Sequence, residues 1–398
     1  MIRTIALVDP HDGGHHLTYI QLISVSLLSL GYRVMIFSPK PESVNTWIAS
    51  NAPQKTEYFH TFRLNDISLN LNTFPVLKDT IKVAWRWNLV KTAIDQACSE
   101  ISRAPDLVFF TWLDSYLDRF LPKYFLNKFP YRWCGLYFHP WHLRNVPPLS
   151  GFRQLLPKPE QLLNTKKCQA IGILDEGIFK KLKDSLPAKT IHVFPDFTDD
   201  AVPDVENNLI RTICAESNGR KIVSFIGKLS KRKGLHQFIE IAKRCDDKNI
   251  FFLFAGQLPE NKLSDNELFE IKQFQSSMPK NCFFYFNEIE SEAVFNALIE
   301  ISDLLFAVYD NFPSSSNILT KAALFRKPVI VSNRYCMGER VKKYNLGVCV
   351  EEGNSLACLA EIKKILFEET QCDFGFSEYY EKNSINKLKE SLQKTISI

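Results

Sequence analysis

A cluster of cationic side chains follows a short apolar stretch near the middle of the chain. Residues 222–226, IVSFI, have the composition of a buried parallel strand, and Gly227 ends that stretch. Four cations come within the next six residues: Lys228, Lys231, Arg232 and Lys233. Gly234 then precedes LHQFIEIAKRC, whose pattern predicts an amphipathic helix. A glycine turn between a parallel strand and a helix is where α/β proteins bind anions, so we interpret this segment as a diphosphate site rather than as a solvated basic loop.

A second polar cluster follows the predicted strand at residues 303–309, DLLFAVY. Four polar residues precede the predicted helix ILTKAALF: Ser314, Ser315, Ser316 and Asn317. Hydroxyl and backbone N–H groups at the start of a helix can bind a phosphate or a sugar hydroxyl. An ordinary helix cap would explain one serine but not the whole run. Lys321, one turn into the helix, would add a further phosphate contact.

The order of strand, Gly-Lys-Leu, polar residues, Lys-Gly and helix resembles the start of the C-terminal domain in family 4 retaining glycosyltransferases of the GT-B fold. In that family, a basic residue after the first glycine and a lysine before the second hold the donor's pyrophosphate. These positions are Lys228, next to Gly227, and Lys233. Lysine at 228 keeps the charge of the family's usual arginine but lacks its bidentate fork.

The resemblance implies an α/β fold with two Rossmann-like domains facing each other across a cleft. It also implies transfer of a hexosyl group from a nucleotide-sugar to a glycan, lipid-linked or small-molecule acceptor, with retention. Neither a metal nor another cofactor is expected, since the two lysines would neutralise the leaving diphosphate and no DxD-type acidic site follows a strand.

The sequence departs from the family in its acidic motif. Alignment on residues 327–330, KPVI, puts Pro313 and Lys321 where the family has two glutamates. Lysine accepts no hydrogen bond, and proline offers no polar side chain. Three alternatives follow: an active variant that uses Asp310 as a catalytic residue together with residues 314–317, a different donor, or lost catalysis. We favour the active variant, in which Glu339 replaces a lost ribose acceptor unless it pairs with a neighbouring cation.

The first half of the chain opens with the predicted strand TIALVD and the loop DGGHH. In the resembling family this loop touches acceptor or donor phosphate, a role that Gly13 and Gly14 would take here. His15 and His16 are either functional or simply exposed. The strand WCGLYFH ends at His139, which matches a family histidine near the reacting sugar and is our second catalytic candidate; a capped strand end is the alternative. His142 is a weaker candidate.

The length of 398 residues predicts two domains, and alternating strands and helices predict parallel sheets with helices on both faces. We place an N-terminal acceptor-side domain at residues 1–200 and a C-terminal nucleotide-sugar domain at residues 201–375. Residues 376–398 are expected to be helical and to return to the first domain. The segment HVFPDFTD resembles the family's interdomain linker.

The net charge of +5 arises in the first half, where residues 1–200 hold 23 of the 49 Lys and Arg but only 18 of the 44 Asp and Glu. This excess indicates an anionic acceptor or an anionic membrane surface, and no nucleic-acid motif is present. Residues 115–133, SYLDRFLPKYFLNKFPYRW, interleave aromatic and cationic residues, as a lipid-facing helix or a helix around a core would.

The ten cysteines show no CxxC pair, which is typical of reduced thiols. With no transmembrane stretch and no signal peptide expected, we predict a cytoplasmic protein, with peripheral contact at the cytoplasmic face of the membrane as an option.

Two other classes of function compete with transfer. Since both motif glutamates are missing, a catalytically inactive GT-B protein that binds a nucleotide or partners an active transferase is the main alternative. A GT-B sugar-nucleotide epimerase is a lesser one, and reaction without any acceptor would distinguish it.

Overall fold

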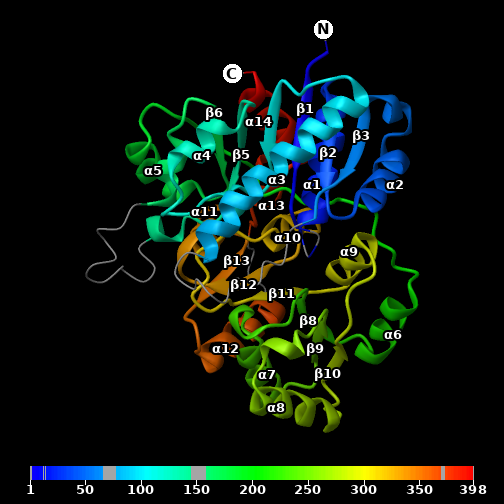
Figure 1. Cartoon of the computed structure of the whole chain (residues 1–398). Helices are drawn as coiled ribbons and strands as arrows, with labels where there is room; N and C mark the ends of the chain where they lie inside the picture. Colours follow the sequence, from blue (N-terminus) through cyan, green and yellow to red (C-terminus); the bar gives the residue numbers. More distant parts are fainter. Residues whose placement is uncertain are drawn as a thin grey trace. The chain divides into compact units, whose positions relative to one another are not determined.

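The computed structural model describes residues 2–11, 13, 15–65, 78–144, 158–368 and 373–397. The chain divides into two compact units, Met1–Phe197 with Ser384–Ile398, and Thr198–Asn383. Each unit is built on one parallel sheet with helices on both faces, as the alternating pattern predicts (Figure 1). Among the described residues, none of the helices is both long and apolar enough to span a bilayer.

A seven-stranded sheet in the order β3-β2-β1-β4-β5-β6-β7 forms the centre of the first unit. Its strands are β1 (Thr4–Val8), β2 (Arg33–Ser38), β3 (Phe59–Arg63), β4 (Leu107–Phe110), β5 (Trp133–Tyr137), β6 (Cys168–Ile173) and β7 (Thr190–Val193). All pairings are parallel. The strand order reverses between β1 and β4, and open α/β sheets bind ligands beyond the carboxyl ends of the strands at such a point.

Helices cover both faces of this sheet. They are α1 (His15–Ser29), α2 (Pro41–Asn51), α3 (Lys78–Ile101), α4 (Lys123–Lys128), α5 (Phe179–Ser185) and α14 (Ile385–Ile396). Trp87 of α3 is buried in one core and donates its indole N–H to the carbonyl of Tyr116 at 2.9 Å. On the other face, α1 and α2 share a core with α14.

The second unit is centred on a six-stranded parallel sheet in the order β10-β9-β8-β11-β12-β13. Its strands are β8 (Lys221–Ile226), β9 (Ile250–Ala255), β10 (Cys282–Tyr285), β11 (Leu304–Ala307), β12 (Val329–Ser332) and β13 (Gly347–Val350). Its helices are α6 (Asn208–Ser217), α7 (Leu235–Arg244), α8 (Asp265–Ser276), α9 (Glu292–Glu300), α10 (Ile318–Leu324), α11 (Tyr335–Tyr344), α12 (Ser355–Phe367) and α13 (Phe376–Asn383). Here the strand order reverses between β8 and β11.

The C-terminal tail is shared between the units, which refines the expected return at residue 376. Phe376 and Tyr379 of α13 are buried in the core of the second unit, so α13 stays there. The return starts only at Ser384, where α14 begins and inserts Leu388 and Leu392 among α1 and the first sheet (Figure 1). The boundary between the units falls at Phe197, a few residues before the position expected from the sequence.

Candidate functional site

Close backbone contacts hold the basic loop after β8 against the ends of β9 and β11, the two strands that flank β8. Gly227 has a φ of +106° and donates its N–H to the carbonyl of Ala255 at 2.8 Å. Gly234 has a φ of +83°, and a Cβ there would lie 2.2 Å from the carbonyl oxygen of Val308, just beyond β11. Only glycine fits this left-handed, crowded position, so Gly234 fixes the loop at the switch point of the second sheet.

The four cations of this loop have different surroundings. Lys231 forms an ion pair with Glu267 of α8 at 2.8 Å, and the Arg232 guanidinium lies over the Phe312 ring, 5.1 Å from its centroid. For Lys228 and Lys233, no carboxylate lies within 4.0 Å in the parts of the chain that the structure describes. The Lys233 ammonium lies 5.4 Å from the centroid of the Tyr309 ring. Lys228 and Lys233 are thus the loop cations that an anionic ligand would neutralise.

Asp310, predicted to be catalytic, follows β11 and is half-buried. Its backbone N–H donates to the carbonyl of Arg232 at 2.8 Å, which ties it to the basic loop. Burial and the nearby carboxylate of Glu352 raise the pKa of the Asp310 carboxyl, while His236 and Lys231 oppose that shift. A carboxyl whose pKa is raised beside a cationic loop is the kind of group that functional sites use for proton transfer.

Two residues near Asp310 have backbone conformations that are costly for residues other than glycine. Asn311 has a φ of +43° and Tyr335 a φ of +58°. The Tyr335 hydroxyl donates to Oδ1 of Asn311 at 2.8 Å, and the Asn311 N–H donates to Glu352 at 3.1 Å. Such strain is concentrated at functional sites. These residues could not be identified from the sequence, because tyrosine gives no signal for a left-handed backbone and a single asparagine gives only a weak one.

The run Ser314–Asn317 precedes α10 as predicted, but its side chains have different environments. Ser314 is buried, and Ser315, Ser316 and Asn317 are partly exposed. The carbonyls of Ser316 and Asn317 accept the first backbone bonds of the helix, from Leu319 and Lys321. The side chain of Asn317 makes no capping hydrogen bond. The run therefore precedes α10 as the sequence predicts, and its side chains differ in exposure.

Lys321 lies inside the second unit rather than at its surface. Its ammonium donates to Oδ1 of Asn296 at 2.5 Å, to Oε2 of Glu292 at 2.8 Å and to the carbonyl of Asp199 at 3.2 Å. The side chain is 2% exposed. These three contacts use its three N–H groups, so this geometry favours a structural role over the predicted phosphate contact. Glu339 is exposed on α11.

In the first unit, His139 lies two residues beyond β5 and is about one-third exposed. The Asp114 carboxylate accepts the backbone N–H groups of Phe138 and His139 at 2.8 and 2.7 Å. The His139 Nδ1 atom lies 3.5 Å from the same carboxylate. Asp114 thus caps the strand end and orients the ring as well. Nε2 of His142 lies 2.9 Å from Oε2 of the fully buried Glu160.

The Gly-Gly loop lies beyond the carboxyl end of β1. Gly13 is exposed, and Gly14 lies outside the described residues. The loop leads into α1, where His16 contacts Asp9, the residue that follows β1, with Nδ1 3.1 Å from each carboxylate oxygen. From the sequence, His16 was left as either functional or simply exposed. Asp9 had no signal beyond its place at the end of a predicted strand.

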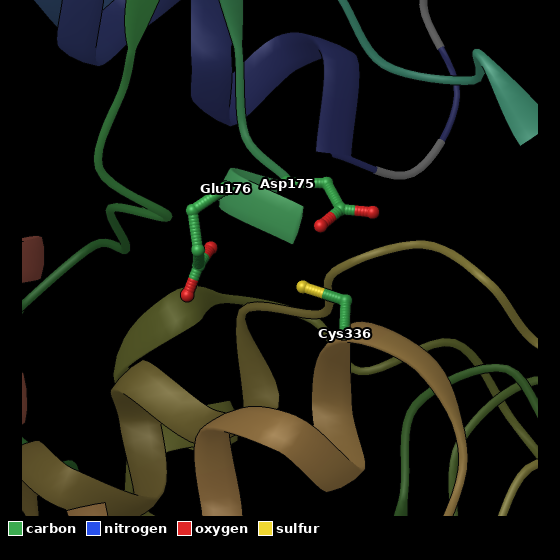
Figure 2. A group of neighbouring side chains, drawn as sticks. All are labelled: Asp175, Glu176 and Cys336. Carbon is green, nitrogen blue, oxygen red and sulfur yellow. The ribbon is translucent and has the colours of Figure 1, made fainter. Parts of the chain in front are cut away.

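Figure 2 labels Asp175 and Glu176, which follow β6, and Cys336 of α11. The two acids belong to the first unit and the cysteine to the second. Asp175 caps the 3-10 turn η6 (Glu176–Ile178) by accepting the Gly177 N–H at 2.9 Å. Its two oxygens also accept from the Arg144 guanidinium at 2.7 and 2.5 Å. This carboxylate is thus engaged within its own unit.

Comparison with known proteins agrees with this architecture. The family model described as glycosyl transferases group 1 matches residues 207–386. No protein with a curated description matches the chain in sequence. Among solved structures, sucrose-phosphate synthase from Thermosynechococcus elongatus superposes with a TM-score of 0.68 at 14% identity, over 99% of this chain and 98% of that one.

Two further solved structures are similar over both units. HepE from Anabaena, solved in complex with UDP-glucose, has a TM-score of 0.64 at 13% identity and covers 100% of both chains. An α,α-trehalose 6-phosphate synthase from Burkholderia multivorans has a TM-score of 0.68 at 10% identity, over 100% of this chain and 98% of that one. The whole chain therefore has the GT-B fold of these structures, with two parallel-sheet α/β units, and residues 207–386 match the model of the glycosyl transferases group 1.

Proposed function

We propose that this protein transfers a sugar from a nucleotide-sugar donor to an acceptor, with retention and without a metal. The observation that carries the proposal is the pair Lys228 and Lys233, which lies in the group 1 domain at the switch point of its sheet and has no carboxylate partner within 4.0 Å among the described residues. Two cations held close together at such a place repel each other unless a bound anion neutralises them. A nucleoside diphosphate supplies that charge.

In the proposed reaction, the two lysines act on the leaving group. As the bond between the anomeric carbon and the diphosphate oxygen breaks, negative charge grows on the diphosphate, and fixed cations stabilise it. Asp310, held to the same loop through Arg232, would contact the transferred sugar, and Ser314–Asn317 would bind its hydroxyls or the phosphate. Gly13 and His139 would act on the acceptor side, in the first unit.

The donor test is a thermal-shift titration with UDP, GDP and ADP and their sugar conjugates, each with and without EDTA. We expect one base to raise the melting temperature, by RT ln(1 + [L]/Kd), equally with and without EDTA. UDP is the first candidate, because HepE was solved with UDP-glucose. Absence of any shift would contradict the donor site. Transfer would then be followed by NMR of the anomeric proton, whose configuration reports retention.

A specific observation favours a second candidate function. Lys321, at the position of one family glutamate, is buried against Glu292 and Asn296 and cannot accept a hydrogen bond from a ribose. A protein that binds a nucleotide but transfers no sugar would fit this departure. Donor binding without hydrolysis or transfer across a broad acceptor panel would support that candidate.

For the acceptor side, we propose contact with an anionic membrane surface through α4. Phe120, Tyr124 and Phe125 are between 42% and 60% exposed, unlike most large apolar side chains of this unit. Lys123 and Lys128 are exposed beside them, and the Lys128 ammonium lies 4.4 Å from the centroid of the Tyr124 ring. Exposed aromatic rings with flanking cations fit the headgroup region of a lipid bilayer. A lipid-linked acceptor would be reached at this surface, from the cytoplasm. A cytoplasmic location fits the nine cysteines of the described residues, which are all free, as in a reducing compartment.

A further inference from the structure

A small cavity in the first unit lies at the amino ends of three neighbouring strands, β1, β2 and β3. Its polar lining consists of Thr4, Arg33, Tyr58, His60 and Arg103. Thr4 and Arg33 are the first residues of β1 and β2, and His60 is the second residue of β3. We propose that this cavity binds a phosphate group, as the inorganic ion or as a phosphate monoester, through residues of the first unit alone. The proposal does not depend on the function proposed above.

The cavity lies at the edge of the sheet opposite to the one where open α/β sheets bind their substrates. β1 runs from Thr4 to Val8, and the Gly-Gly loop follows its other end. At about 3.3 Å per residue, the four steps of this strand put roughly 13 Å between the two edges of the sheet. A ligand in the cavity would therefore leave the carboxyl ends of the strands accessible.

The guanidinium of Arg33 has no hydrogen-bond acceptor among the described residues. Its Nε atom is buried and unsatisfied, whereas its two terminal nitrogens, also without an acceptor, remain accessible. The Tyr58 ring, whose centroid lies 5.2 Å from Cζ of Arg33, attracts the cation but supplies no lone pair to its N–H groups. Buried N–H groups are nearly always bonded in folded proteins, so Arg33 calls for an acceptor that these parts of the chain do not provide.

Further cations lie around Arg33. Arg103 lines the same cavity just beyond α3, and the Lys55 ammonium lies 5.3 Å from the centroid of the Tyr58 ring. The partial negative charge at the carboxyl end of α3 favours a cation at Arg103, but it gives no reason for Arg33 at the start of β2. The local charge is therefore positive beyond what the helix end explains.

Carboxylates do not neutralise the two arginines. Over the described residues, neither Arg33 nor Arg103 has a carboxylate oxygen within 4.0 Å. The Asp106 carboxylate accepts the backbone N–H of Thr4 at 2.7 Å, and Asp106 is not part of the lining. Cations gathered without a counter-charge repel one another, and a bound anion relieves that repulsion.

The size and the donors of the cavity favour phosphate over other anions. Its volume is about 80 Å³, and one water molecule takes up about 30 Å³ of the liquid, so a group of a few heavy atoms fits but a nucleotide does not. Arginine matches phosphate through two parallel N–H groups. Arg33, His60 and Arg103 come from three different segments. The tetrahedral oxygens of phosphate can meet donors from several directions, whereas a carboxylate has only two oxygens.

The binding test is calorimetric titration with inorganic phosphate at constant ionic strength, on the wild type, Arg33→Met and Arg103→Met. The matched control is Arg63→Met, since Arg63 ends the same sheet's β3 at its other end and pairs with Glu42 at the surface. We expect Kd for phosphate to rise about 10- to 100-fold in each cavity variant, the usual effect of losing a charged hydrogen-bond donor, and to change less than twofold in the control. Arg103 is exposed, so its variant keeps the test valid if Arg33→Met does not fold. A wild type that binds no phosphate, or equal affinities in all four proteins, overturns the proposal.

Phosphate can also bind to the basic loop after β8, so the titration is repeated on the double variant Lys228→Ala, Lys233→Ala. This variant should keep the wild-type affinity for phosphate, because none of the residues that line the cavity belongs to the second unit. Loss of phosphate binding in the double variant overturns the proposal. The titration uses neither a nucleotide nor an acceptor, so its result stands even if the protein binds no UDP and transfers no sugar.

A comparison of ligands distinguishes the two sources of the phosphate group. Methyl phosphate that binds the wild type as tightly as inorganic phosphate supports a monoester site, with the ester oxygen facing out of the cavity. Binding of inorganic phosphate without methyl phosphate supports a site for the free ion. Acetate is the negative probe, and acetate that binds as tightly as phosphate overturns the assignment to a phosphate group.

Discussion

The ammonium group of Lys321 forms an ion pair with Glu292 at 2.8 Å, and it does so inside the second unit, where the lysine side chain is 2% exposed. The same ammonium is bonded to Asn296 at 2.5 Å, so α10 is fixed to α9 through one side chain. A lysine stands here at a position where the resembling family has an acid, and its partners come from the preceding helix.

Replacement of Lys321 by Met should therefore destabilise the protein. The variant keeps the length of the side chain but removes the ammonium that donates to Asn296, Glu292 and the Asp199 carbonyl, at a cost of about 3 kcal/mol. Urea denaturation measures this change. If Lys321 instead binds the donor phosphate, the variant will unfold like the wild type and lose affinity for UDP.

Replacement of Lys228 or Lys233 by Ala should weaken diphosphate binding. Each lysine would contribute about 1.5–3 kcal/mol as a charged hydrogen-bond donor, so Kd for UDP should rise about 10- to 100-fold in each variant. Lys231→Ala is the control, because Lys231 is already paired with Glu267. Calorimetric titration with UDP gives the three dissociation constants. Equal losses of UDP affinity in all three variants would refute the proposal that Lys228 and Lys233, but not Lys231, bind the diphosphate.

Gly234→Ala should damage the basic loop far more than Gly219→Ala. Both glycines have positive φ, +83° and +74°, so each variant carries the cost of about 1–2 kcal/mol for a left-handed alanine. Only at Gly234 would the new Cβ also meet a carbonyl oxygen, that of Val308, whereas Gly219 faces open space. Thermal unfolding should show a larger loss for Gly234→Ala, together with weaker UDP binding; equal losses would contradict the close contact.

The stability gained by Asp310→Asn should increase with pH. Burial, and next the Glu352 carboxylate, raise the pKa of Asp310 in the folded protein above its value in the unfolded chain. The folded state therefore binds the proton more tightly, and the stability associated with that proton is present in acid and is lost as the pH rises through the raised pKa. Asparagine does not ionise. The free energy of unfolding of the variant, measured by urea denaturation, should therefore increase relative to that of the wild type between pH 4 and pH 7. A constant difference over this range would contradict the shift.

The double variant Tyr124→Ser, Phe125→Ser should bind vesicles of anionic lipid less tightly than the wild type, because it removes the two exposed rings of α4. Vesicle sedimentation at low and at physiological salt measures the binding. The control is Phe269→Ser, which removes a ring that is 67% exposed on α8 of the other unit. Equal loss in both proteins would show that general hydrophobicity, not α4, drives the contact.

The sequence was most informative where strands are buried on both faces. The apolar runs at 222–226 and 250–256 correspond to β8 and β9, whose residues from Ile222 onward are buried, and they fix the place of the basic loop. The edge strand β3, FHTFR, was not identified, because only its first residue is buried and its polar residues give no clear alternation.

The site itself was only partly predictable for a physical reason. Gly227, Lys228 and Lys233 are close in sequence, so they form one short motif that can be recognised without the structure. The partners of Lys321 lie on α9, and the interaction of Asp9 with His16 requires the folded turn between β1 and α1. Contacts between separate elements depend on packing, which a single sequence does not display.

The position of α14 has a consequence for synthesis. Its residues Leu388, Leu392 and Ile396 complete the core of the first unit, yet they leave the ribosome only after the 186 residues of Thr198–Asn383. At about 5–20 residues per second, the first unit waits roughly 10–40 s with an apolar groove uncovered. During that interval the nascent first unit is a natural client for a chaperone, whereas the second unit can complete its own core before α14 emerges.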